Sequence, residues 1–170
     1  MKPTQEPTEI DYIKVAVIID CEANIEINGK PGRQYQLQIT VASTNPRLTA
    51  WCRARFGGAI YPQFYKKKPP NTAATDRWRM QSYAAAELLT KCLPHFIIKR
   101  PQAEIGIRFQ DTYSVPYQRA SEQVKLLREE LRKQLLALTA PGPKPIAQEA
   151  VKVPVKRQNQ GNLFAKEISN

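Results

Sequence analysis

The chain has 170 residues, a hydrophobic fraction of 42% and a formal net charge of +11 at pH 7. This length fits one domain of ordinary size with a core of its own and room for a tail. The basic balance favours a polyanionic partner, nucleic acid before an anionic membrane surface. No apolar run approaches the roughly 20 residues of a membrane-spanning helix, and the first eight residues lack the apolar segment of a signal peptide. We therefore expect a protein of the cytoplasm or an organellar matrix, neither secreted nor membrane-spanning.

The three cysteines, Cys21, Cys52 and Cys92, lie far apart and form no CxxC pair. This pattern argues against a zinc site or a disulfide framework and for a reducing compartment. We expect each of them to be a small buried apolar residue.

Composition divides the chain into three parts. Residues 1–8 form a flexible arm with two prolines, residues 9–139 form the domain, and residues 140–170 form a basic, Pro- and Lys-rich tail that we expect to be disordered. The tail carries five basic and two acidic residues, so a net charge of +8 belongs to residues 1–139. The basic character is therefore mainly that of the domain.

The domain begins with an apolar helix, predicted from about Glu9 to Ile19. Thr8 and Asp11 have the spacing of a capping box at its start. Because the helix is apolar nearly all round, we expect it to be buried, either centrally or against a partner chain. Two acids, Asp20 and Glu22, follow it.

Four later segments alternate polar and apolar residues with period 2, as strands with one buried face do. They are residues 24–30, 34–41, 60–65 and 77–81. A Gly- and Pro-containing turn at residues 28–32 joins the first two as a hairpin. Pro62 predicts that the third strand lies at an edge or is bulged.

Helices are predicted at residues 45–56, 84–92, 99–110 and 121–138. Gly57 and Gly58 stop the first of these. The last carries Val124, Leu127, Leu131, Leu135 and Leu138 at helical spacing, which favours packing on the domain over a coiled coil. This order of elements predicts an α+β domain with one antiparallel sheet.

The polar side of the sheet is rich in amides and guanidiniums. Gln and Asn can bind adenine, and Arg guanine, in a major groove that admits a β-ribbon, while Lys suits phosphates. A solvated sheet face normally mixes Lys, Glu, Ser and Thr, so DNA readout is favoured over a bland face. The candidate DNA-binding residues are Asn24, Glu26, Asn28, Lys30, Arg33, Gln34, Gln36, Gln38, Thr40, Tyr61, Gln63, Tyr65, Lys66, Lys67, Arg77, Arg79 and Gln81.

Asp20 and Glu22 stand where the helix meets this sheet. They could be a helix cap and a surface residue. Acids beside a phosphate-binding surface are repulsive unless a cation lies between, however, and a divalent metal is the simplest such cation.

Residues 15–23, VAVIIDCEA, resemble the LAGLIDADG motif of homing endonucleases. Further segments resemble that family in the same order along the chain. They are residues 41–45, 56–61, 76–80, 86–89, 93–104 and 127–138. The resemblance covers about residues 10–139.

The resemblance implies an αββαββα core followed by C-terminal helices, with a saddle-shaped sheet that straddles the DNA major groove. One motif per chain implies a homodimer that reads a long pseudo-palindromic site. Its implied activity is site-specific hydrolysis of double-stranded DNA with Mg²⁺, for which Mn²⁺ can substitute, in the service of intron homing. The implied dimer interface holds Ile13, Ala16, Val17, Asp20 and Cys21.

The resemblance also implies roles for single residues. Glu22 and Asp20 would be the two acids of the metal site. Glu22 would bind the metal, and Asp20 would be more structural than catalytic. Lys99 would stabilise developing charge at the phosphate, and Ser43 would orient water. His95 is expected to be a half-buried structural residue.

The motif departs from the family where glycine is expected, at Val17, Cys21 and Ala23. Larger side chains in the helix seam could displace the acids, and displacement by about 1 Å can cost about a hundredfold in rate. A cleavage-inactive DNA- or RNA-binding protein, such as a splicing helper or regulator, is therefore the alternative. Glu22 and Lys99 favour the nuclease, and Val17 and Cys21 favour the binder.

Overall fold

A computed structural model describes residues 6–30, 34–63, 74–114 and 120–139. The expected tail, residues 31–33 of the turn between the first two strands and residues 64–73 after the third strand lie outside these ranges. The elements are α1 (Glu9–Glu22), β1 (Ala23–Asn28), β2 (Gln36–Ser43), α2 (Pro46–Phe56), β3 (Ala59–Gln63), β4 (Thr75–Gln81), α3 (Ser82–Cys92), α4 (Arg100–Asp111) and α5 (Glu122–Thr139), with short 3-10 turns η1 (Leu93–His95) and η2 (Thr112–Ser114). This order is the predicted α+β core with C-terminal helices.

The four strands form one antiparallel sheet in the order β1-β2-β4-β3. β3 is thus an edge strand, as Pro62 predicts, since proline has no backbone N–H to donate to a neighbouring strand. β2 and β4 are central, and their inward residues are among the most buried of the described chain. These residues are Leu37, Ile39, Val41, Trp78 and Met80.

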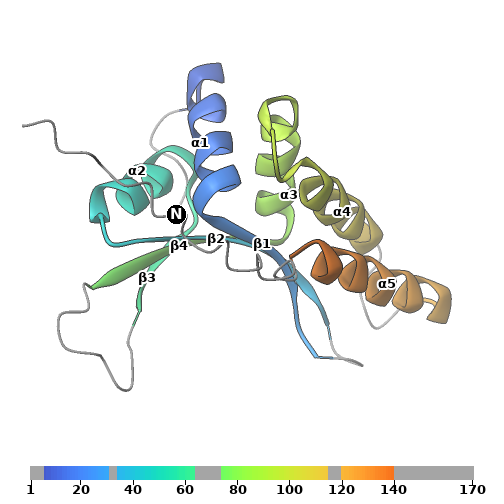
Figure 1. Ribbon diagram of the computed structural model, residues 1–170. Coiled ribbons are helices and arrows are strands. Elements are labelled where there is room, and N and C mark those ends of the chain that lie inside the picture. The colour runs from blue at the N-terminus through green and yellow to red at the C-terminus, as the bar shows by residue number, and fades with distance from the viewer. Residues whose placement is uncertain (1–5, 31–33, 64–73, 115–119, 140–170) are drawn as a thin grey trace, which may run out of the picture. The chain divides into compact units, whose positions relative to one another are not determined.

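The described helices lie on one face of the sheet and leave the other open (Figure 1). The period-2 pattern accounts for this arrangement, because it places apolar side chains on one face of each strand. The core forms where those side chains meet the buried residues of the helices, among them Val15, Ile19, Leu89 and Phe109.

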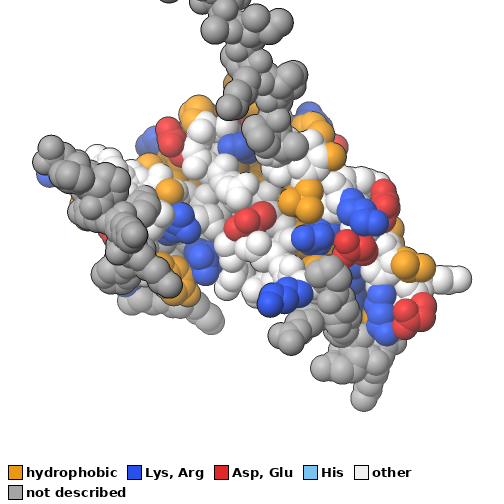
Figure 2. All heavy atoms as spheres, turned by 60° about the horizontal axis from the view of Figure 1, so that its bottom comes forward, with side chains coloured by type: hydrophobic (Ala, Val, Ile, Leu, Met, Phe, Trp, Pro, Cys, Tyr) orange, Lys and Arg blue, Asp and Glu red, His pale blue; other side chains and the backbone are white. Residues whose placement is uncertain are grey.

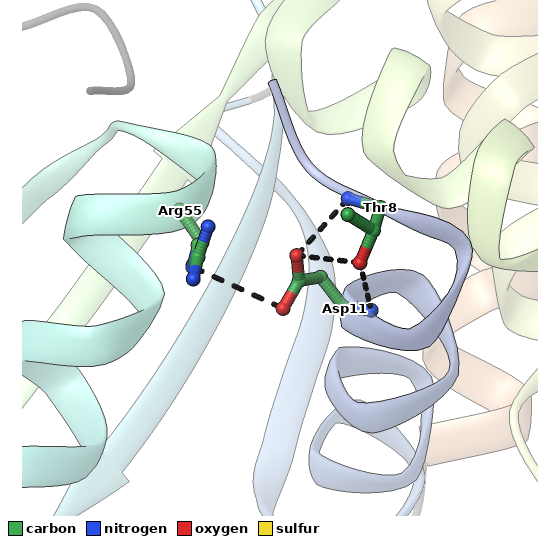
Figure 3. A network of polar contacts seen from close by, with 3 residues as sticks. All are labelled: Thr8, Asp11 and Arg55. Atoms are coloured by element: carbon green, nitrogen blue, oxygen red, sulfur yellow. Dashed lines mark hydrogen bonds and ion pairs between the residues drawn. The ribbon is translucent and has the colours of Figure 1, made fainter. Parts of the chain in front are cut away.

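The N-terminal end of α1 is closed by the predicted capping box (Figure 3). The Asp11 carboxylate accepts hydrogen bonds from the Thr8 amide at 3.0 Å and the Thr8 hydroxyl at 2.9 Å. The Nε atom of Arg55, on α2, lies 3.9 Å from the other Asp11 oxygen. These contacts lower the pKa of Asp11, through the Thr8 bonds first and the Arg55 charge second.

One expectation for α1, its C-terminal end, is wrong. The helix continues through Glu22 rather than stopping at Ile19, because buried Ile19 and Asp20 keep their places in its last turn. The expected burial nearly all round is not reached within one chain, where Ile10, Ile13 and Val17 are 62%, 43% and 51% exposed. The helix packs across the sheet through one face only, which excludes the central position and leaves the partner-chain alternative.

The break between α2 and β3 needs glycine. Gly57 ends α2 with φ +78°, and Gly58 follows with φ +80°. A Cβ atom on Gly58 would lie 2.6 Å from the carbonyl oxygen of Arg79 on β4. The indole nitrogen of Trp78 donates to the Gly57 carbonyl at 2.8 Å, which holds this close approach in place.

α5 packs on α4 and β1, which confirms packing on the domain over a coiled coil. Leu131 and Leu135 are buried, but Leu127 and Leu138 are almost half exposed, contrary to their expected inward place. Arg128 occupies the buried face in their stead, because its guanidinium reaches Thr112 Oγ1 at 2.9 Å and stacks on the Tyr113 ring at 3.8 Å.

All three cysteines lie in described segments. Cys52 and Cys92 are buried as predicted, and burial raises the pKa of each thiol to about 12. Cys21 is exposed, contrary to the expectation, because it follows buried Asp20 onto the open side of α1.

Across the described ranges, no helix has both the length and the apolar character needed to cross a bilayer.

Candidate nucleic-acid interface and its carboxylates

The open face of the sheet carries polar side chains in cross-strand rows. Glu26 pairs with Gln38, which pairs with Gln81, and Asn24 pairs with Thr40, which pairs with Arg79. Figure 2 looks toward this face, where most visible side chains are uncharged, an acidic patch lies near the middle and basic side chains lie to both sides. The face is therefore neither apolar nor uniformly charged.

Side-chain hydrogen bonds join these rows. The Gln81 amide nitrogen donates to the side-chain oxygens of Gln36 at 3.1 Å and Gln38 at 2.9 Å. Gln38 donates in turn to Glu26 at 2.8 Å and to Thr40 at 3.0 Å, and Asn24 donates to Glu26 at 3.2 Å. Such bonds hold the amides in fixed orientations, which is what readout of base edges requires.

A hollow of about 310 Å³ opens on this face at the C-terminal end of α1. Its lining includes Glu22, Glu26, Arg77 and Arg79. Arg77 donates to Gln63 at 2.9 Å, and Arg79 lies 4.9 Å from the centre of the Tyr61 ring. The Arg79 Nε atom is buried and makes no hydrogen bond within the described ranges. Acids and guanidiniums that are far apart in the sequence thus border one hollow.

Asp20, only 7% exposed, does not face that hollow. Its carboxylate accepts backbone hydrogen bonds from Ile97 at 2.7 Å, Ile98 at 3.3 Å and Lys99 at 2.8 Å. These amides precede the first turn of α4, where amides lack helical partners. Asp20 therefore ties the end of α1 to the start of α4.

Lys99 in turn contacts the end of α1. Its ammonium donates to the carbonyl oxygens of Ile19 at 2.7 Å and Ala23 at 2.6 Å, at the C-terminal end of α1. A cation is favoured at that end by the helix dipole. Burial lowers the pKa of Lys99, while the negative groups of Asp20, Cys21 and Glu22 oppose the shift. We call these reciprocal contacts of Asp20 and Lys99 the clasp.

Glu22 lies inside the segment that the clasp holds, yet it is exposed. No hydrogen bond or ion pair to its carboxylate occurs among the described residues. The described ranges also hold no cluster of three His, Cys, Asp or Glu side chains that could bind a metal by themselves. Mg²⁺ commonly takes one or two carboxylates together with waters and substrate phosphates. Glu22 fits such a site as one ligand of several.

The exposed side of α1 carries Ile13, Val17 and Cys21, one turn apart from each other. Ala16 and Asp20, the other two predicted interface residues, are buried within the chain itself. Ile97 and Ile98 are also exposed, beside the same end of the helix. This apolar strip has the character of a surface that packs against another surface.

Most of the remaining predicted residues lie near the sheet. Ser43 ends β2 opposite Asp76, and its hydroxyl accepts from the Asn45 amide at 3.0 Å. Lys30 and Gln34 flank the β1–β2 connection. His95 is half-buried and lies 2.8 Å from a Glu9 oxygen, the structural role expected of it. Arg33, Tyr65, Lys66 and Lys67 lie outside the described residues.

Two features escaped the reading of the sequence. The clasp joins residues that are separated by 76 to 80 positions in the sequence, which no local pattern reports. Pro101, at the start of α4, was the available signal, since it marks a helix start with free amides before it. Buried Arg128 was signalled by its place three residues before Leu131, on the buried face of the helix.

No protein-family model and no curated protein matches the sequence. Solved structures do match. The homing endonuclease I-CvuI, in complex with its DNA target in the presence of calcium, has a TM-score of 0.62 at 18% identity, covering 80% of this chain and 85% of that one. The archaeal intron-encoded homing endonuclease I-Vdi141I, complexed with DNA, has a TM-score of 0.64 at 14% identity, covering 81% and 89%.

I-SmaMI, bound to uncleaved DNA, has a TM-score of 0.52 at 18% identity, with 79% of this chain and 50% of that one covered. This chain thus spans most of the first two proteins and half of the third. The helices, the strand order and the open sheet agree with the resemblance of residues 10–139. The chain has the fold of the LAGLIDADG homing endonucleases.

Proposed function

We propose that the protein is a site-specific, metal-dependent endonuclease that cleaves double-stranded DNA as a homodimer. The observation that carries the proposal is the placement of Glu22. It is an exposed carboxylate with no hydrogen bond or ion pair to the described residues, at the junction of an apolar helix face and a polar, arginine-bearing sheet. An acid that is only solvated at the surface does not need to be placed between a helix face and a sheet in this way.

The open face supports DNA as the substrate. Its central rows offer amides and guanidiniums, groups that read base edges in the major groove. The positive net charge favours a polyanion. The structural neighbours I-CvuI and I-Vdi141I are themselves complexes with DNA.

Glu22 supports metal use. Mg²⁺, or Mn²⁺ in its place, would polarise the phosphate and supply an activated water when bound between Glu22 and the DNA. In each chain Glu22 would provide a carboxylate ligand, and the clasp would keep that carboxylate in position. Lys99 acts in this scheme through the α1 carbonyls that it binds, and Ser43 stands at the same sheet end as a candidate for orienting water.

The exposed strip of α1 supports the dimer. Packing two copies through Ile13, Val17 and Cys21 would bury this strip and bring the two Glu22 residues to one axis. The match to only half of I-SmaMI, against most of I-CvuI, agrees with a chain that supplies one of two equivalent halves.

The test of cleavage is incubation of the protein with a randomised plasmid library in Mg²⁺, followed by sequencing of the ends. We expect defined double-strand breaks that fall by about a hundredfold or more with Glu22→Gln, since a metal supplies several kcal/mol of transition-state stabilisation. Binding to the selected site should persist. The matched control is Glu87→Gln, an exposed acid on α3 away from the open face, which should cut normally.

The test of the dimer uses Cys21, the exposed thiol of the three. A short bis-maleimide should link two chains of the wild-type protein through Cys21, and Cys21→Ser should abolish the link. Buried Cys52 and Cys92 should not react. A monomer in light scattering at micromolar concentration, both with and without DNA, would refute the dimer.

The second candidate function is cleavage-inactive binding of DNA or RNA on the same scaffold. The bulk of Val17 and Cys21 on the exposed strip favours it, because larger groups in a helix seam separate the helices. Tight, sequence-selective binding with no cutting in Mg²⁺ or Mn²⁺ would decide for this candidate. Cutting gained by Val17→Gly with Cys21→Gly would identify the seam as the cause.

A further inference from the structure

The hollow on the open face is bordered by two carboxylates, and only Glu22 has a place in the proposed chemistry. The second, Glu26, stands on β1 one row from Arg79. A carboxylate on a surface that approaches phosphates costs binding energy unless it meets a donor. Resting on the proposed function, we infer that Glu26 is a base-reading residue that selects cytosine at one position of each DNA half-site.

Glu26 is held ready to accept. Gln38 donates to one carboxylate oxygen at 2.8 Å and Asn24 donates to the other at 3.2 Å. A carboxylate offers about four acceptor positions, so each oxygen keeps room for another donor. Within the described ranges no ion pair joins Glu26 to Arg77 or Arg79, although all three border the hollow. Its charge is therefore left for a ligand.

The hydrogen-bond donors and acceptors of the four nucleobases identify that ligand as cytosine. Cytosine presents an N4 amino donor in the major groove and is the base that Glu and Asp accept from. Adenine also presents an amino group, but its N7 acceptor lies beside it and repels a carboxylate. Guanine and thymine present acceptors at the corresponding place, so both are disfavoured.

The arginines suit the guanine that pairs with this cytosine. Two strand spacings, about 10 Å, separate β1 from β4, which compares with a major groove about 12 Å wide. Glu26 can thus reach one DNA strand while Arg79 reaches the other. Arginine binds guanine O6 and N7, and Arg79 lines the hollow beside Glu26. The hollow therefore suits G·C pairs, whereas the hydrogen-bonded amides of Gln36 and Gln81 suit adenine.

The experiment is selection of bound duplexes from a randomised library in Ca²⁺, followed by sequencing. The wild-type protein should enrich cytosine at one symmetry-related position per half-site. Glu26→Gln should move that position to adenine, which glutamine binds at N6 and N7, with about a tenfold loss of cytosine preference. Glu26→Lys should move it to guanine. Glu87→Gln, which makes the same charge change away from the face, should leave the selected site unchanged.

The two proposals fail in different ways. No enrichment of any sequence by the wild-type protein would overturn the proposed function and the role of Glu26 together. A selected site that stays the same in Glu26→Gln and Glu26→Lys, with melting temperatures equal to wild type, would overturn the role of Glu26 alone. Loss of cutting with an unchanged site in Glu26→Gln would make Glu26 a second metal ligand and also overturn it.

Discussion

The two ends of α1 hold their acids in different ways. At the N-terminal end, Asp11 bonds to Thr8, three residues before it in the chain. At the C-terminal end, Asp20 bonds to amides of residues 97–99, and Lys99 bonds back to the helix. Glu22, two residues after Asp20, has neither kind of contact with the residues that the structure describes. A local cap stabilises a helix, whereas a long-range clasp fixes its end relative to another element, and the unpartnered acid is the one available to a ligand.

Breaking the clasp should have the largest effect on stability. Asp20→Asn replaces an acceptor of three amide bonds with a group that is half donor. Hydrogen bonds to charged groups contribute about 1.5–3 kcal/mol each, so we expect the free energy of unfolding to fall by about 2–3 kcal/mol. Urea denaturation would measure it. Asp111→Asn, an exposed acid at the end of α4, should change it little, and equal losses in the two variants would contradict the clasp.

The Lys99 half of the clasp should have a smaller and pH-dependent effect. Lys99→Met leaves two carbonyl groups at the end of α1 without their donor, which we expect to cost about 1–2 kcal/mol at pH 7. Lys133→Met, an exposed lysine on α5, is the matched control and should cost less than Lys99→Met.

Burial lowers the pKa of Lys99 in the folded protein. Between that pKa and the ordinary value of about 10.4, the unfolded chain binds more protons, so wild-type stability gains with rising pH. Lys99→Met removes the gain. The stability difference between wild type and Lys99→Met should therefore widen from pH 8 to pH 10, and a narrowing would show that the folded pKa is raised instead.

The local cap should have the smallest effect. Thr8→Ala should cost about 1 kcal/mol, as loss of an N-cap does. Thr90→Ala, an exposed change in the last turn of α3, should cost nothing. Because the folded pKa of Asp11 is lowered, its contribution is present above the ordinary value of about 3.9 and is lost as pH falls through the folded value. The difference between wild type and Asp11→Asn should vanish in acid, and its growth there would refute this sign.

Periodic patterns in the sequence predicted the parts of the fold that local chemistry decides. Alternation predicted the strands and the open face, Pro62 predicted the edge strand, and Thr8 with Asp11 predicted the helix start. The far end of α1 was misjudged, because the contacts that keep Asp20 in the helix come from α4. The exposure of Cys21, Leu127 and Leu138 was missed for a similar reason. An apolar residue at helical spacing shows its face only once the neighbouring elements are placed.

The candidate site, like the fold, could be predicted only in part from the sequence. The chemistry of its residues was readable from the types of side chain on the strands. Their grouping was not, since the hollow joins β1 to Arg77 and Arg79 across β2. Asp20 differs from Glu22 because backbone amides of residues 97–99 lie next to it. Sequence spacing cannot predict which amides lie nearby.

The amide network of the open face has a consequence for changing its target. Gln81 donates to both Gln36 and Gln38, and Gln38 donates onward to Glu26. Turning any one amide to suit a new base would set like groups against each other in the next pair. Interactions in such networks are not additive. Substitutions among Gln36, Gln38 and Gln81 are therefore not independent of one another, and a new target at these amides would require exchanging the three residues together.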